Sequence, residues 1–160
     1  MKKIILALPS LLFMVLVACN NNNTQANNSQ ESKADSLAKE VEEVHNVVMP
    51  KSMKIPNLRK EIGRITDSIK KLPPKARDAA APYLAKLDAI DKDLGSAYDR
   101  MEDWMKSFGD KLDEFSSDST KVTVEQKIQY YTQEKINIDK IKEAVLGNVQ
   151  KADSLLRSKF

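Results

Sequence analysis

The chain contains few of the residues that build disulfide frameworks, metal centres and phosphate loops. Its 160 residues include one Cys, one His and four Gly. One Cys excludes an intrachain disulfide framework, and one Cys with one His cannot supply the ligands of a zinc finger. The glycines are isolated in the sequence, which excludes a glycine-rich phosphate-binding loop. Aromatic residues make up only 6% and charged residues 31%, so aliphatic side chains dominate the apolar content, as is typical of long helices.

The first 18 residues, MKKIILALPSLLFMVLVA, have the pattern of a secretory signal peptide. Two lysines precede an apolar run that is too short to span a bilayer comfortably. At its end, Leu16-Val17-Ala18-Cys19 resembles the lipobox of bacterial lipoproteins. The resemblance implies that cleavage makes Cys19 the new N-terminus and that Cys19 is lipidated, with two or three acyl chains that anchor the protein durably in a membrane. The alternative is a plain signal peptide followed by a free Cys.

Residues 19–31 are expected to form the lipidated Cys and a flexible tether. The stretch 20–30, NNNNTQANNSQ, has no charge and no large apolar side chain, so it cannot bury enough surface to fold. Asn20 follows Cys19 at the position where lipoproteins retained in the inner membrane often have Asp. This resemblance favours the outer membrane, with the protein facing the periplasm.

Residues 32–160 are predicted to form one all-α domain, an up-down-up antiparallel bundle of three long helices. The first helix, at about 32–72, carries a seam with alternating steps of four and three residues, and Lys51 is its only polar member. The seam consists of Leu37, Val41, Val44, Val48, Lys51, Ile55, Leu58, Ile62, Ile65, Ile69 and Leu72. Pro50 and Pro56 predict a kink or a local break in this helix, and Pro73-Pro74 ends it.

Two further helices are predicted at about 75–115 and 124–158. The seam of the second helix is Tyr83, Leu87, Ile90, Leu94, Ala97, Met101, Trp104 and Phe108, and that of the third is Tyr131, Glu134, Ile138, Ile141, Val145, Asn148, Ala152 and Leu155. Thr123 and Gln126 have the spacing of a capping box that opens the third helix. Matched lengths and short connections favour the bundle over the alternative, an extended coiled-coil dimer.

Candidate chemical groups are few. His45, Met49 and Met53 are spaced i, i+4 and i+8, so one helix face could present an imidazole and two thioethers to Cu(I) or haem. The alternative, which we expect, is packing without metal or cofactor, because Met fills irregular gaps such as the one that Pro50 creates. A hydrolase triad would also need His45, and no GxSxG-type elbow accompanies it, so we expect no enzyme activity.

Charge is unevenly distributed along the first helix. Residues 31–48 carry five acidic and two basic side chains, a net charge of −3, whereas residues 49–72 carry seven basic and two acidic side chains, a net charge of +5. A helix dipole explains the direction of this trend, but its effect fades beyond the last turn. The candidate interaction face consists of Lys51, Lys54, Arg59, Lys60 and Arg64. Its expected partner is an envelope protein or an anionic component of the cell envelope.

Nucleic acid is not an expected partner. Removing the signal peptide takes Lys2 and Lys3 from the 26 basic residues, which leaves 24 against 23 acidic residues and a net charge of +1. The basic character of the full chain therefore comes largely from the signal peptide, and it gives no global argument for nucleic-acid binding.

The segment Val44-His45-Asn46-Val47-Val48-Met49-Pro50-Lys51 resembles a VHDxVMPK-type segment of small bacterial lipoproteins that carry the label "viral A-type inclusion protein". That label reflects coiled-coil similarity and implies no viral role. Asn46 departs from the family's acidic residue, and the family implies no established activity. Two function classes follow from the sequence: a non-enzymatic structural or interaction lipoprotein of the envelope, and, as the alternative, a helical-bundle carrier of a metal, haem or lipid-like molecule.

Overall fold

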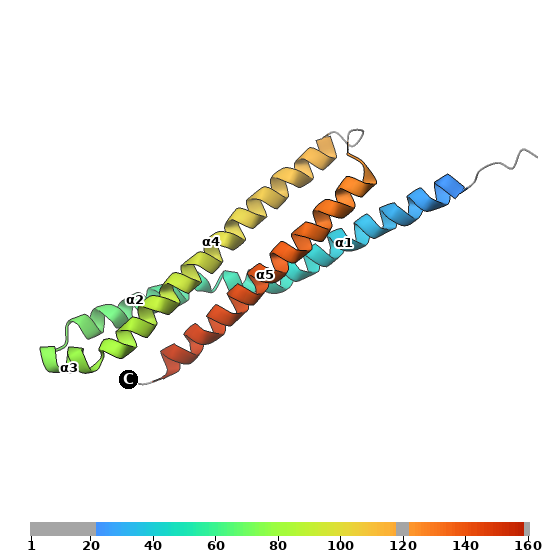
Figure 1. The fold of residues 1–160 in the computed structure, drawn as a ribbon. Helices are drawn as coiled ribbons and strands as arrows, with labels where there is room; N and C mark the ends of the chain where they lie inside the picture. The colour runs from blue at the N-terminus through green and yellow to red at the C-terminus, as the bar shows by residue number, and fades with distance from the viewer. Residues whose placement is uncertain (1–21, 118–121, 159–160) are drawn as a thin grey trace, which may run out of the picture.

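The computed structural model describes residues 22–117 and 122–158, with side chains from residue 28 onward (Figure 1). These residues form five helices and no strand: α1 (Asn22–Ser52), α2 (Ile55–Lys70), α3 (Pro74–Ala79), α4 (Ala81–Ser117) and α5 (Val124–Arg157). The predicted all-α class is therefore confirmed. The proposed signal peptide and Cys19 lie outside the described residues.

Helix α1 begins ten residues earlier than the predicted first helix. Residues 22–31, which we predicted to belong to a flexible tether, are helical, so this part of the prediction is wrong. Extending an existing helix adds one hydrogen bond for each residue that is ordered, which is easier than nucleating a new helix. Burial starts later, at Ala34, close to the predicted start of the packed domain at residue 32.

The predicted first helix is broken between its two prolines. Helix α1 ends at Ser52 and α2 begins at Ile55, with Met53 and Lys54 in a turn between them. Pro56 has no N–H for the Ser52 carbonyl and would crowd it in a continuous helix. The Lys54 N–H instead donates to the Lys51 carbonyl at 3.1 Å, one residue nearer than in an α-helix. The local break is thus confirmed, and it separates two helices.

The break also changes which residue enters the core. Lys51, which we placed in the seam, is exposed, whereas Ser52 is only 2% exposed. Because Ser52 lies four residues after Val48 and three before Ile55, the rhythm of four and three residues passes through Ser52 instead of Lys51. The prediction of Lys51 as a seam position is therefore wrong by one residue.

The second predicted helix is also divided, into α3 and α4. Ala80 lies between them, and its N–H donates to the carbonyls of Ala76 and Arg77, both at 3.1 Å. Pro82 follows in the first turn of α4, where a missing N–H costs nothing. The third predicted helix is confirmed as α5, whose capping box joins Thr123 and Gln126 by reciprocal hydrogen bonds of 2.9 and 3.2 Å.

The helices pack through the predicted seams into one core. Figure 1 shows the chain reversing at α3 and again between α4 and α5. Helix α1 packs chiefly against α5, α2 chiefly against α4, and α4 and α5 against each other. The largest fully buried aliphatic side chains of the core are Val41, Val48, Ile55, Ile69, Leu87, Leu94, Ile138 and Val145.

Hydrogen bonds between α4 and α5 satisfy the polar groups at their interface. The Trp104 indole N–H donates to Glu134 at 2.6 Å, and the Asn148 amide donates to the Asp93 carbonyl at 3.1 Å. Glu134 and Asn148 are the two polar members of the α5 seam. Both side chains are partly exposed at the edge of the core, and these bonds favour one alignment of α4 against α5.

Ile62 tests the packing of α2. This side chain is buried against the core, whereas Lys60 on the same helix is exposed. We expect Ile62→Ala to lower the free energy of unfolding by about 2–5 kcal/mol, the usual cost of truncating a buried Ile. Lys60→Ala, the control, should change it by less than about 0.5 kcal/mol. Urea unfolding followed by circular dichroism measures both values, and equal small losses would show that α2 is not packed.

Candidate functional site

The predicted basic residues surround the break between α1 and α2. Lys51 lies in the last turn of α1, Lys54 in the turn after it, and Arg59, Lys60 and Arg64 on α2. The structure brings them into one region, but their side chains face different neighbours. Lys51 lines a groove toward α5, whereas Arg59 lines another toward α4. The five residues therefore surround the break and do not form a single flat face.

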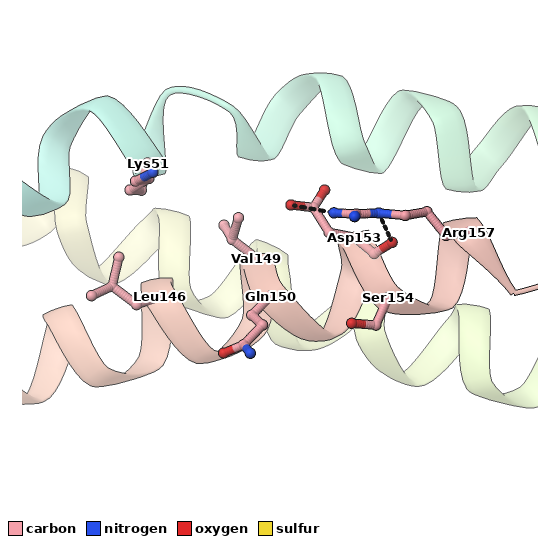
Figure 2. A pocket seen from close by; sticks show the side chains of 7 residues that line it. All are labelled: Lys51, Leu146, Val149, Gln150, Asp153, Ser154 and Arg157. Carbon is pink, nitrogen blue, oxygen red and sulfur yellow. Dashed lines mark hydrogen bonds and ion pairs between the residues drawn. The ribbon is translucent and has the colours of Figure 1, made fainter.

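Figure 2 shows the groove on the α5 side. Its volume is about 430 Å³, with Lys51 on the α1 side and the other lining residues on α5. Leu146 and Val149 form its apolar part. Arg157 donates to the Asp153 carbonyl at 3.2 Å and lies 3.9 Å from the Asp153 carboxylate. This exposed pair on a single helix holds Arg157 only weakly, so Lys51 and Arg157 are both open to an external anion.

Arg59 joins α2 to α4 by a two-point contact. Its Nε and Nη2 donate to the two carboxylate oxygens of Asp91 at 2.9 and 3.1 Å. These hydrogen bonds raise the pKa of Arg59 above its ordinary value. Gly95 makes room for the guanidinium, because a Cβ at this position would lie 3.2 Å from Arg59 Cζ. Arg59 is thus a link between helices, and its charge is largely compensated.

Arg64 is compensated within α2 itself. Its guanidinium donates to both carboxylate oxygens of Glu61, at 2.6 and 2.9 Å, and these bonds lower the pKa of the Glu61 carboxyl. Lys51, Lys54 and Lys60 form no ion pair with any described residue. Of the five candidates, these three lysines keep uncompensated charge that could meet a partner.

The three residues of the candidate soft-metal stripe do not converge on one point. His45 is half-buried and its ring lies 5.8 Å from the Trp104 ring, while Met49 packs against the core. Met53 is 65% exposed because α1 ends one residue before it. The assumption of a continuous helix through residue 53 is therefore wrong, and Met53 does not continue the line of His45 and Met49. Among the described residues, no cluster of three or more His, Cys, Asp or Glu side chains could hold a metal ion.

A second helix face beside His45 was not predicted from the sequence. Ala38, Glu42 and His45 line grooves between α1 and α4, opposite Trp104 and Phe108. Their spacing of four and three residues is that of one helix face and could have indicated it. The neighbouring apolar seam through Val41 and Val48 gives a stronger pattern, because it is longer and richer in aliphatic residues.

Comparisons with protein-family models, with curated proteins and with solved structures find no match to this chain. No helix within the described ranges has both the length and the apolar character needed to cross a bilayer.

The Arg59–Asp91 contact can be measured by a double-mutant cycle with Arg59→Met and Asp91→Asn. Because both side chains are partly exposed, we expect a coupling of about 0.5–1 kcal/mol, near the upper end for surface pairs. The coupling should shrink in 1 M NaCl, where the Debye length is about 3 Å. The exposed pair Lys92–Asp88 on α4 is the control and should couple more weakly. Equal couplings for the two pairs would contradict a linking role for Arg59.

Proposed function

We propose that this protein is a membrane-anchored periplasmic lipoprotein that acts as a non-enzymatic structural or interaction module of the cell envelope. The observation that carries the proposal is the sequence Leu16-Val17-Ala18-Cys19 at the end of an apolar, lysine-led segment. Lipidation of Cys19 would hold the helices at a membrane surface through acyl chains, without a spanning helix. The outer membrane, facing the periplasm, is the proposed location.

The proposed architecture is an up-down-up bundle in which α1 and α2 together act as one rod. Three hydrogen bonds between α4 and α5 support an antiparallel course of these two helices: Trp104–Glu134, Asn148–Asp93 and Tyr83–Leu155. Along this series, residue numbers rise in α5 as they fall in α4. The contacts between the rod and α4 also indicate an antiparallel course, because residue numbers rise from His45 to Arg59 as their partners fall from Trp104 to Asp91. Glu40 lies 3.8 Å from Lys135, and Lys51 lines one groove with Leu146, so residue numbers rise together along α1 and α5, which supports a parallel course.

The proposed contact region consists of the three uncompensated lysines at the break, Lys51, Lys54 and Lys60. They are exposed, and the nearby groove of Figure 2 opens at the surface between helices. Such an open surface favours contact with a macromolecular or anionic envelope component over the enclosure of a small ligand. It supports an interaction module more than the alternative, a carrier of metal, haem or lipid.

The anchor is tested by Cys19→Ser. We expect this variant to lose acylation and to move from the membrane fraction to the soluble fraction, since the thiol that accepts lipid is gone. Fatty-acid labelling and fractionation after a salt wash provide the measurements. A variant that stays with membranes after washing would show that the lipobox interpretation is wrong or that a second anchor exists.

The contact region is tested with a soluble Cys19→Ser form mixed with isolated envelopes. Changing Lys51, Lys54 and Lys60 to Glu should remove envelope binding, and the wild-type binding should weaken as salt shortens the Debye length from about 10 Å at 0.1 M. The matched control changes the exposed Lys86, Lys106 and Lys140 to Glu, which alters the net charge equally. If both triple variants were recovered with the envelopes to the same extent, net charge alone would explain the loss of binding, and the proposed contact region would be wrong.

A further inference from the structure

Helix α1, the first half of the rod, leaves the space between itself and α4 open. Helix α1 packs closely on α5 and contacts α4 only sparsely, whereas α2 packs chiefly on α4. The turn at Met53 and Lys54 causes this change of partner, because it redirects the rod between the two prolines. Between α1 and α4, on the N-terminal side of the break, the helices leave a groove that no described segment fills.

This α1–α4 groove consists of two hollows of about 290 and 340 Å³. Both are lined by Glu42 and Phe108, so they form one elongated depression. Its apolar lining comes from Ala38 and His45 on α1 and from Trp104, Met105, Phe108 and Leu112 on α4, and Tyr131 of α5 also lines it. Residues 35–45 of α1 follow the groove for about 15 Å at 1.5 Å per residue, which is the length of about three helical turns.

The aromatic rings form a stable wall along the groove. Trp104 is only 7% exposed, and Phe108 stacks on it with ring centroids 4.9 Å apart. The His45 ring lies 5.8 Å from Trp104. Phe108 and His45 both pack on Trp104, so the indole is well covered. The surface that the groove presents is therefore apolar. Gly109 adds open space, because a Cβ there would have no atom within 4 Å.

Both helices that border the groove are acidic. Residues 31–48 carry a net charge of −3, and residues 98–117 carry six acidic and three basic side chains, also a net charge of −3. At the groove itself, Asp35 and Glu42 are exposed, while Lys39 lies 3.8 Å from Glu43. An apolar floor with acidic margins is complementary to an apolar stripe flanked by cations.

We infer that the α1–α4 groove binds a cationic amphipathic α-helix of another protein. The apolar stripe of such a helix would cover Met105 and Phe108, and its Lys or Arg side chains would reach Asp35 and Glu42. A second copy of this chain does not supply the helix, because the apolar face of its basic helix, α2, is already buried through Ile55, Ile62 and Ile69. The acidic margins repel an anionic lipid surface.

The test uses the purified full-length protein and a model peptide of about 18 residues, or five turns, built from Leu and Lys in helical periodicity. Trp104 is already buried, so binding is followed by the fluorescence anisotropy of a dye attached to the peptide. We expect a saturable rise in anisotropy that weakens with salt. The same peptide with Glu in place of Lys should cause no rise. Equal binding of the two peptides, or no binding of the Lys peptide, would overturn the inference.

Gly109→Leu locates the site. A Cβ at this position meets no atom within 4 Å, and Gly109 lines the groove, so a Leu side chain there should occupy the groove and weaken peptide binding about tenfold or more. Gly147→Leu is the matched control, since Gly147 on α5 also has open space around a Cβ, and its binding should be unchanged. Circular dichroism verifies that both variants are folded. Unchanged binding by Gly109→Leu would overturn the inference. The proposed function does not depend on this outcome, because anchoring and envelope binding are measured separately.

Discussion

The pair of prolines at 50 and 56 is the constraint on which the arrangement of the helices depends. Pro56 deprives the Ser52 carbonyl of its helical donor, so the helix ends and restarts after Met53 and Lys54. The seam nevertheless continues, because Ser52 takes the buried position between Val48 and Ile55. The chain therefore keeps a continuous core while the rod changes its main partner from α5 to α4. The open groove beside Trp104 follows from the same change.

Polar contacts at the edge of the core help to align the helices. An aliphatic seam alone can slide by one heptad with little loss, since one Leu or Ile packs much like another. Glu134 and Asn148 favour one alignment, because each forms a hydrogen bond with one group on α4: the Trp104 indole and the Asp93 carbonyl. Arg59 adds a third such contact through Asp91, beside the space that Gly95 leaves. Residues that appear as flaws in the hydrophobic pattern therefore help to set the alignment.

The charges of the first helix separate into two regions with different surroundings. In the basic region, Arg59 and Arg64 are held by carboxylates of the chain itself, which leaves three lysines around the break with uncompensated charge. In the acidic region, Asp35 and Glu42 border an apolar groove that faces α4. The two regions thus suit partners of opposite charge.

The sequence by itself determined the all-α class, the buried seams, the capping box at Thr123 and the break near Pro50 and Pro56, because each depends on the local spacing of side chains or on a missing N–H. It did not determine where the helix would begin, since the Asn-rich segment has no stop signal. Nor did it show that Ser52 would replace Lys51 in the core, which depends on the path of the turn. The pairing of Arg59 with Asp91 and the groove between α1 and α4 were decided only by tertiary structure. Both arise from residues far apart in the chain, and they depend on which neighbour each half of the broken rod packs against.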